Sequence, residues 1–320
     1  MIGEVDKQKR PARRRLFVVT SAAVVLALVV ATVCWYGSAG RKNGGGGPPS
    51  GSVSSSLPPR VVSGYWQAWG NPRIELHEVP AQYNLIFAAF AVADGAGTGR
   101  VRFDQEVQPR ASFIADVDAL QRAGRRVSLS VGGAEDGGIE ITSRAQVKAF
   151  SASVGKIIDL YHFTGVDWDL EHGIDRRSIA DVSRQLKAQY GPQFLITMAP
   201  MQNQPDYEDL AVEIQDIIDM VNPQFYNGGQ PNRRYILDEA RRWAAKVGAD
   251  RVGMGFMTVQ ADQATGVLPP SEVAATWRDV VRLLPRARGL MTWSINLDST
   301  SGYRFASTCG PLVRGGPVAD

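Results

Sequence analysis

Eight short apolar runs rich in β-branched residues recur along the chain and alternate with longer segments of helical periodicity. This alternation is typical of βα units around a parallel sheet. It predicts an α/β protein with an eight-stranded (β/α)8 TIM barrel, and an open doubly wound sheet is the alternative. The eight runs cover residues 61–66, 85–91, 126–131, 165–170, 194–199, 220–226, 251–257 and 289–295.

The segments between these runs carry apolar residues at spacings of three and four, as in Leu210, Ile214, Ile217 and Ile218. They predict helices over residues 145–160, 177–189, 207–218, 234–246 and 272–283. A barrel needs about 250 residues, and a chain of 320 residues that is 44% hydrophobic can supply its core. Because barrel active sites lie at the C-terminal ends of the strands, functional residues are expected there.

The first 60 residues differ from the rest of the chain. Six basic residues between Lys7 and Arg15 precede an uncharged run over residues 16–36, and about 20 apolar residues span a bilayer as a helix. Positive charge before a span favours a cytoplasmic N-terminus. We therefore expect a basic cytoplasmic segment over 1–15, a transmembrane anchor or cleaved signal over 16–36, a Gly/Pro/Ser linker over 37–60 and a catalytic domain over 61–320.

This division also explains the charge of the chain. Residues 1–60 hold nine Lys/Arg and two acids, a net charge of +7, which leaves −4 for the remainder of a chain whose total is +3. The high isoelectric point thus belongs to the N-terminal segment, and we expect no nucleic-acid partner. The domain is expected at the outer cell-membrane surface or secreted, as a monomer, with Cys309 lacking an intrachain disulfide partner.

Three acids alternate at the end of the fourth run. On a strand, Asp167, Asp169 and Glu171 project from one face, about 6.5 Å apart from one to the next. Three such carboxylates repel one another, so at least one should keep its proton near neutral pH. A protonated carboxyl group at this place is a candidate general acid. A surface or capping role is the alternative.

Clustered carboxylates also suit hard metal ions. The calcium-loop pattern fails, because it requires Gly at the sixth position and His172 stands there. Neither a His-Glu-x-x-His motif, a Gly-x-Ser-x-Gly elbow nor a phosphate-binding loop occurs. We therefore expect neither a metal nor a cofactor, with a catalytic metal as the weaker alternative.

Small residues end the third run at Ser130-Val131-Gly132-Gly133, where backbone can approach a ligand or a neighbouring strand. With Asp167-x-Asp169-x-Glu171, this segment resembles the chitinases of glycoside hydrolase family 18. Four further segments resemble the bacterial branch of that family: Gly64-Tyr65-Trp66, Met198-Ala199-Pro200-Met201, Gln224-Phe225-Tyr226-Asn227 and Met291-Thr292-Trp293-Ser294-Ile295-Asn296. The sequence departs from the family at Thr164, where a further Asp is usual, and at His172.

The resemblance implies a substrate-assisted mechanism, in which the 2-acetamido group of the sugar attacks the anomeric carbon. Glu171 would then be the acid and base, Asp169 would hold the acetamido N–H, and Asp167 would share a proton with it. Tyr226 would donate to the acetamido carbonyl, and Trp293 would lie beneath the sugar. The other residues assigned to substrate binding are Tyr65, Ser130, Gly132, Gly133, Met198, Gln224 and Asn227; for Tyr65 and Met198 a core role is equally open.

The function implied is hydrolysis of β-1,4-linked N-acetylglucosamine in chitin or chito-oligosaccharides, with retention of configuration. Two alternatives stay open at this point. One is a carbohydrate-binding barrel that has lost catalysis. The other is an endo-acting enzyme, an endo-β-N-acetylglucosaminidase, on another N-acetylated glycan.

Overall fold

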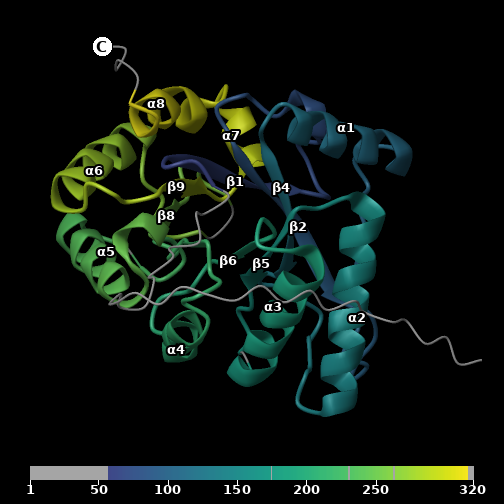
Figure 1. Ribbon diagram of the computed structural model, residues 1–320. Helices are drawn as coiled ribbons and strands as arrows, with labels where there is room; N and C mark the ends of the chain where they lie inside the picture. The colour runs from purple at the N-terminus through teal and green to yellow at the C-terminus, as the bar shows by residue number, and fades with distance from the viewer. Residues whose placement is uncertain (1–56, 174, 230, 262–263, 316–320) are drawn as a thin grey trace, which may run out of the picture. The chain divides into compact units, whose positions relative to one another are not determined.

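The expected eight-stranded parallel barrel is confirmed in the computed structural model, which describes residues 57–173, 175–229, 231–261 and 264–315 (Figure 1). Its strands follow the order β7-β6-β5-β4-β2-β1-β9-β8. Two isolated bridges, Val221 with Val252 and Gln224 with Gly255, join the ends of this order and close the ring. The barrel strands are β1 (Val61–Gln67), β2 (Leu85–Ala93), β4 (Arg126–Gly132), β5 (Gly165–Asp169), β6 (Leu195–Met198), β7 (Met220–Val221), β8 (Gly253–Phe256) and β9 (Gly289–Thr292).

Helices surround the barrel on its outer side (Figure 1). They are α1 (Arg110–Arg122), α2 (Arg144–Tyr161), α3 (Arg176–Tyr190), α4 (Pro205–Glu213), α5 (Arg233–Val247), α6 (Pro270–Leu283), α7 (Ile295–Thr300) and α8 (Arg304–Val313), with short 3-10 turns η1 (Leu76–Glu78) and η2 (Ala249–Arg251). The helices expected at α2, α3, α5 and α6 are confirmed. The short strand β3 (Val101–Phe103), antiparallel to β2, was not expected.

Three expected elements have the wrong extent. Helix α4 ends at Glu213 rather than Ile218, and a turn buries Ile214 and Ile218 instead, so their spacing reflects packing and not a continuous helix. Strand β7 stops at Val221, because Pro223 has no N–H group to extend the ladder. Strand β9 stops at Thr292, and Ser294 caps α7 by accepting a hydrogen bond from the Leu297 N–H.

Two apolar layers follow from the alternation of side chains along the strands. The larger layer lies between the strands and the helices and contains Trp66, Trp168, Phe150 and Trp277. The inner layer fills the barrel with ten buried residues: Leu57, Val61, Tyr65, Leu85, Phe87, Ala89, Leu195, Ala199, Met220 and Met291. This filled interior is a packed core, so a substrate can reach the barrel only at its rim.

The chain joins the barrel at the N-terminal ends of the strands. Arg288, just before β9, donates hydrogen bonds to the carbonyl groups of Leu57 and Pro58 at 3.3 and 2.8 Å. Leu57 is buried in the inner layer. Residues 57–60, which composition assigns to the linker, therefore pack against this end of the barrel.

The rest of the predicted linker, the predicted anchor over 16–36 and the basic segment over 1–15 lie outside the described residues. Within the part of the chain that the structure describes, no helix has the length and apolar character needed to cross a membrane.

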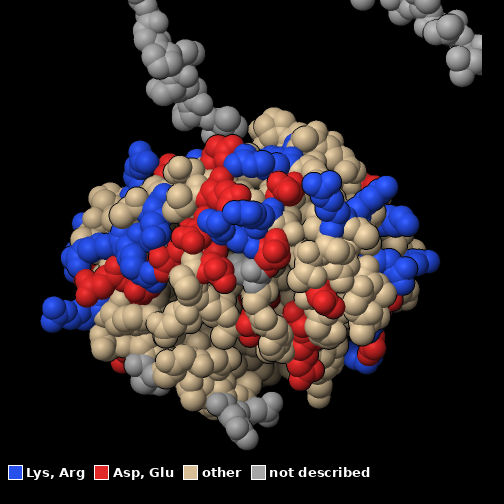
Figure 2. Space-filling model, turned by 90° about the horizontal axis from the view of Figure 1, so that it is seen from below, with Lys and Arg blue, Asp and Glu red and all other residues tan. Residues whose placement is uncertain are grey.

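Charged side chains of both signs are interspersed on the face seen from below in Figure 2. Ion pairs cross between neighbouring helices, as between Arg176 on α3 and Glu213 on α4 at 3.5 Å. Arg184 on α3 pairs with Asp216 at 2.7 Å in the turn that follows α4. Such exposed pairs contribute little to stability, at most about 1 kcal/mol each, so the barrel depends on its two apolar layers.

Close contact between β1 and β9 gives a test of this packing. A Cβ atom at Gly289 would lie 1.7 Å from the Val61 carbonyl oxygen. We expect Gly289→Ala to lower the free energy of unfolding by about 3 kcal/mol or more, measured by urea denaturation. Gly155 in α2 is the matched control, because a Cβ atom there meets the Tyr190 hydroxyl at 3.5 Å and the Gln189 Nε2 at 4.0 Å, which are ordinary contact distances. Gly155→Ala should gain about 0.5–1 kcal/mol from helix propensity. Equal effects at the two sites would show that close approach of β1 and β9 does not require Gly289.

Candidate active site

Asp167 lies at the centre of a hydrogen-bonded row across three strands. The strand register places Ser130 of β4 and Thr197 of β6 beside it. Its carboxylate accepts hydrogen bonds from the hydroxyl groups of Thr197 at 2.6 Å, Tyr65 at 2.8 Å and Ser130 at 2.9 Å. Complete burial raises the pKa of Asp167, and the three hydroxyl donors oppose that rise.

Asp169, two residues further along β5, is also buried, with 2% of its surface exposed. Gln224 donates a hydrogen bond to its Oδ1 at 2.8 Å and holds the Ala199 carbonyl at 3.0 Å with the same nitrogen. Burial, then repulsion from Glu171 and Asp167, raises the pKa of Asp169 well above its ordinary range. A proton is therefore retained within this group of acids.

Glu171 lies just beyond β5, in the turn that follows the strand, and is only half-buried. Burial raises the pKa of Glu171, and the Asp136 carboxylate raises it further. His172 and a hydrogen bond from Gln224 act in the opposite direction. Of the three acids, Glu171 combines a raised pKa with access to solvent, which are the properties of a general acid.

A cleft of about 900 Å³ opens at the C-terminal ends of the strands, and both Asp169 and Glu171 line it. Its aromatic wall begins with Trp293, which stacks on Phe90 with ring centroids 5.5 Å apart. Trp69 follows at 5.8 Å from Phe90 and is exposed. Carboxyl groups facing aromatic rings suit a ligand that has both polar groups and an apolar face, as a sugar ring has.

Glycine at position 132 allows β4 and β5 to come together beneath this cleft. Gly132 has a φ of +116°, and a Cβ atom there would lie 2.1 Å from the Asp169 carbonyl oxygen. The next residue, Gly133, donates its N–H to the same carbonyl at 2.6 Å. Of the two roles expected for these small residues, the structure shows the approach to the neighbouring strand.

The predicted site residues divide into two groups. Those that line the cleft are Asp169, Glu171, Tyr226, Asn227 and Trp293. Those that do not line it are Asp167, Tyr65, Ser130, Gly132, Gly133, Met198 and Gln224. Hydrogen bonds connect four members of the second group to Asp167 or Asp169, namely Tyr65, Ser130, Gly133 and Gln224. Met198, in contrast, is fully buried in the outer apolar layer. Thr164 lies at the opposite end of β5, and its hydroxyl oxygen accepts a hydrogen bond from Arg126 at 3.1 Å.

Several residues of the site were not identified from the sequence. Thr197 makes the shortest hydrogen bond to Asp167. The sequence indicates Thr197 only as a polar residue two places after Leu195, on the same inward face of the strand. Phe90 forms the aromatic wall together with Trp69, but an aromatic residue at a strand end is more often part of a core. For Trp69 the sequence left open a place in the cleft or a cover over the barrel mouth, and Trp69 lines the cleft. Tyr207 on α4 accepts a hydrogen bond from the Leu170 N–H, between Asp169 and Glu171, and no local pattern indicates this contact.

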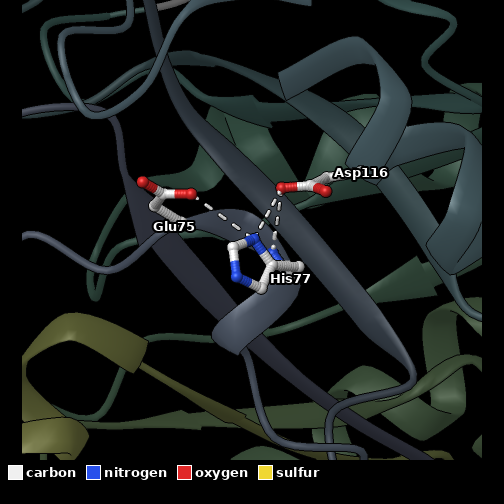
Figure 3. Close-up of side chains that lie close together, drawn as sticks. All are labelled: Glu75, His77 and Asp116. Carbon is white, nitrogen blue, oxygen red and sulfur yellow. Dashed lines mark hydrogen bonds and ion pairs between the residues drawn. The ribbon is translucent and has the colours of Figure 1, made fainter. Parts of the chain in front are cut away.

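One group of side chains among the described residues has the composition of a metal site, and it lies apart from the acids. Figure 3 shows Glu75, His77 and Asp116, whose ligand atoms lie within 4.8 Å of one another. The His77 Nδ1 is 3.1 Å from Asp116 and 3.5 Å from Glu75, and the hydrogen bond to Asp116 raises the pKa of His77. Gln108 donates to the same Asp116 oxygen at 2.8 Å. These bonds account for the cluster as an imidazole ring held between two carboxylates.

Comparison with known proteins gives consistent results. The model of glycosyl hydrolases family 18 matches residues 61–262. Exochitinase 1 of Streptomyces olivaceoviridis is 26% identical over 81% of this chain, which spans 56% of the length of that relative. A chitinase of Enterococcus faecalis is 28% identical, with coverage of 75% of this chain and 82% of its own. A Streptomyces coelicolor protein crystallised under the name Chitinase A is 30% identical and superimposes with a TM-score of 0.75 over 80% of this chain and 99% of its own.

The raised pKa of Asp169 predicts a pH-dependent stability. The folded protein retains a proton that an unfolded Asp, with a pKa of about 3.9, has released. The contribution of protonated Asp169 to the free energy of unfolding is therefore complete below about pH 4 and is lost as the pH rises through the folded-state pKa. Asn at this position cannot ionise. The free energy of unfolding of Asp169→Asn, relative to the wild type, should therefore increase between about pH 4 and pH 8 in urea titrations.

Asp175 provides a control of opposite sign, because the hydrogen bonds from Ser178 lower its pKa. Its contribution is present above the unfolded pKa and is lost as the pH falls through the folded pKa. Asp175→Asn should therefore lose stability relative to the wild type as the pH rises through about 4. A difference between Asp169→Asn and the wild type that is constant with pH would contradict the assignment.

Proposed function

This chain belongs to glycosyl hydrolase family 18, and from that premise we propose that it hydrolyses β-1,4-linked N-acetylglucosamine in chitin or chito-oligosaccharides. The single observation that carries the proposal is the row of Asp167, Asp169 and Glu171, which leads from the buried barrel interior to the cleft. The names of the relatives, exochitinase and chitinase, agree with this substrate class.

In the proposed reaction the substrate supplies its own nucleophile. The acetamido oxygen of the sugar attacks the anomeric carbon, while Glu171 gives its proton to the glycosidic oxygen and the leaving sugar departs. Water then attacks the same carbon and loses a proton to Glu171, which restores the acid. Two inversions at one carbon give net retention. The half-buried position and raised pKa of Glu171 support this double role.

Asp169 is assigned to the acetamido group. It accepts that group's N–H and balances the positive charge of the oxazolinium intermediate. Asp167 lies behind it on the same face of β5, where three hydroxyl donors allow it to carry charge or share a proton with Asp169. Tyr226, which lines the cleft beside both Asp169 and Glu171, donates its hydroxyl to the acetamido carbonyl.

Trp293 forms the apolar floor for the sugar at the point of cleavage. It is partly exposed in the cleft and is supported by stacking on Phe90 and by Tyr65 at 5.4 Å. A pyranose presents a face of C–H bonds that packs on an aromatic ring. The reaction in this form uses no metal and no cofactor.

The predicted anchor extends the proposal to location. A membrane-spanning segment over 16–36 with basic residues before it would hold the catalytic domain outside the cell, and cleavage would release it. The substrate would then be an extracellular glycan.

Loss of the proton donor is the first test. The full chain with Glu171→Gln should release products from chito-oligosaccharides at least about 100-fold more slowly than the wild type, because general acid catalysis contributes about 10²–10⁴-fold. Glu140→Gln, at an exposed acid outside the cleft, is the matched control and should keep full activity.

The products distinguish the alternatives. If neither protein cleaves chito-oligosaccharides but both bind them, the barrel is a carbohydrate-binding protein. Cleavage of an N-glycan or peptidoglycan fragment alone would identify an endo-acting enzyme on another N-acetylated glycan. Full activity of Glu171→Gln would overturn the proposed mechanism.

Removal of the charge at Asp169 tests the role of the substrate's acetamido group. Asp169→Asn keeps the shape and the contact with Gln224 but cannot balance the intermediate, so kcat should fall by about 10- to 100-fold. The measurement is kcat on chito-oligosaccharides, beside Asp175→Asn, which lies outside the cleft and should not change it. Unchanged turnover of Asp169→Asn would remove Asp169 from the mechanism.

A further inference from the structure

Three hydrogen bonds from outside β5 hold the turn that carries Glu171. The Leu170 N–H donates to the Tyr207 hydroxyl, and Gln204 Nε2 donates to the Glu171 carbonyl at 3.2 Å. Both of these partners belong to α4 and its N-cap. The third bond is made by His172, whose Nε2 lies 2.6 Å from the Ala134 carbonyl on the loop after β4. The turn is therefore held from two sides.

The loop that receives the His172 bond is itself fixed to the barrel. Asp136 is buried, its carbonyl accepts the Ala93 N–H of β2 at 2.8 Å, and its carboxylate accepts the Gly138 N–H at 2.7 Å. Ala134 and Glu135 of the same loop line the cleft beside Glu171. His172 thus connects the turn of the acid to a part of the cleft wall that is already held in place.

A carbonyl oxygen accepts hydrogen bonds and cannot donate them, so the Nε2 of His172 must carry a proton to make this contact. The other side-chain restraints on the turn, from Tyr207 and Gln204, act on its backbone from the α4 side. On the other side, Gly133 at the start of the β4 loop holds the base of the turn by donating its N–H to the Asp169 carbonyl at 2.6 Å. Beyond Glu171, His172 supplies the contact of the turn with the same loop.

We propose that His172 is a positioning residue for the hydrolysis, which fixes the Glu171 turn against the loop after β4 through its hydrogen bond to the Ala134 carbonyl. The inference rests on the proposed function and deepens it. His172 itself does not line the cleft, so its effect is exerted through the orientation of Glu171. Small errors in the position of a catalytic group reduce the rate strongly.

Two substitutions that differ in reach test the proposal. The side-chain amide nitrogen of Gln lies as many bonds from Cα as the Nε2 of His, whereas that of Asn is one bond closer. Both replacements are neutral and polar. His172→Gln can keep the bond to the Ala134 carbonyl and should retain kcat within about threefold, whereas His172→Asn should lower kcat about tenfold with KM changed less than twofold.

His77→Asn is the control for loss of an exposed imidazole, because His77 bonds to Asp116 outside the cleft (Figure 3). Its kcat and KM should equal those of the wild type. Thermal denaturation of all variants separates folding from function, since a purely structural role of the bond would lower the melting temperature of His172→Asn and leave its kcat unchanged.

The outcomes are distinguishable from failure of the proposed function. If Glu171→Gln is inactive and His172→Asn keeps wild-type kcat, only the positioning role is overturned. Equal losses of kcat in His172→Gln and His172→Asn would also overturn it, because the bond would then not be the cause. Full activity of Glu171→Gln would overturn the proposed function instead.

Discussion

The arrangement of the site depends on the burial of carboxyl groups at the end of β5. Asp167 and Asp169 follow each other on the inner face of one strand, and both are buried, although Asp169 reaches the floor of the cleft. An ionised carboxylate in such a place is costly unless it is protonated or receives several hydrogen bonds. Both conditions are met here, since three hydroxyl groups donate hydrogen bonds to Asp167 and the raised pKa of Asp169 favours its protonated form.

The neighbouring strands supply the hydrogen-bond donors that the buried carboxyl groups need. Register brings Ser130 and Thr197 level with Asp167, and Tyr65 reaches it across the barrel interior. Gln224 performs the same task for Asp169 from the segment after β7. Polar residues inside the barrel thus replace the water that a surface carboxylate would have. The gradient of burial from Asp167 to Glu171 leaves the last acid accessible and next to the cleft.

Much of the fold could be predicted from the sequence, because periodicity reports directly on burial. The eight strands followed from short apolar runs rich in β-branched residues, and helices α2, α3, α5 and α6 followed from apolar spacings of three and four. The errors occurred where apolar residues are buried by turns, as at Ile214 and Ile218, or where Pro223 interrupts a run. Periodicity records which residues are buried, and it does not record whether the backbone between them is regular.

The candidate site shows the same division. The sequence by itself determined that three acids share one face of a strand, since the period of two is a property of the strand backbone. It also indicated the end of the barrel where they lie. Only the tertiary structure decided which residues meet them: Thr197, Tyr207 and Phe90 are distant in sequence and are brought together by register and helix packing. Such contacts depend on closure of the whole barrel, which no local pattern encodes.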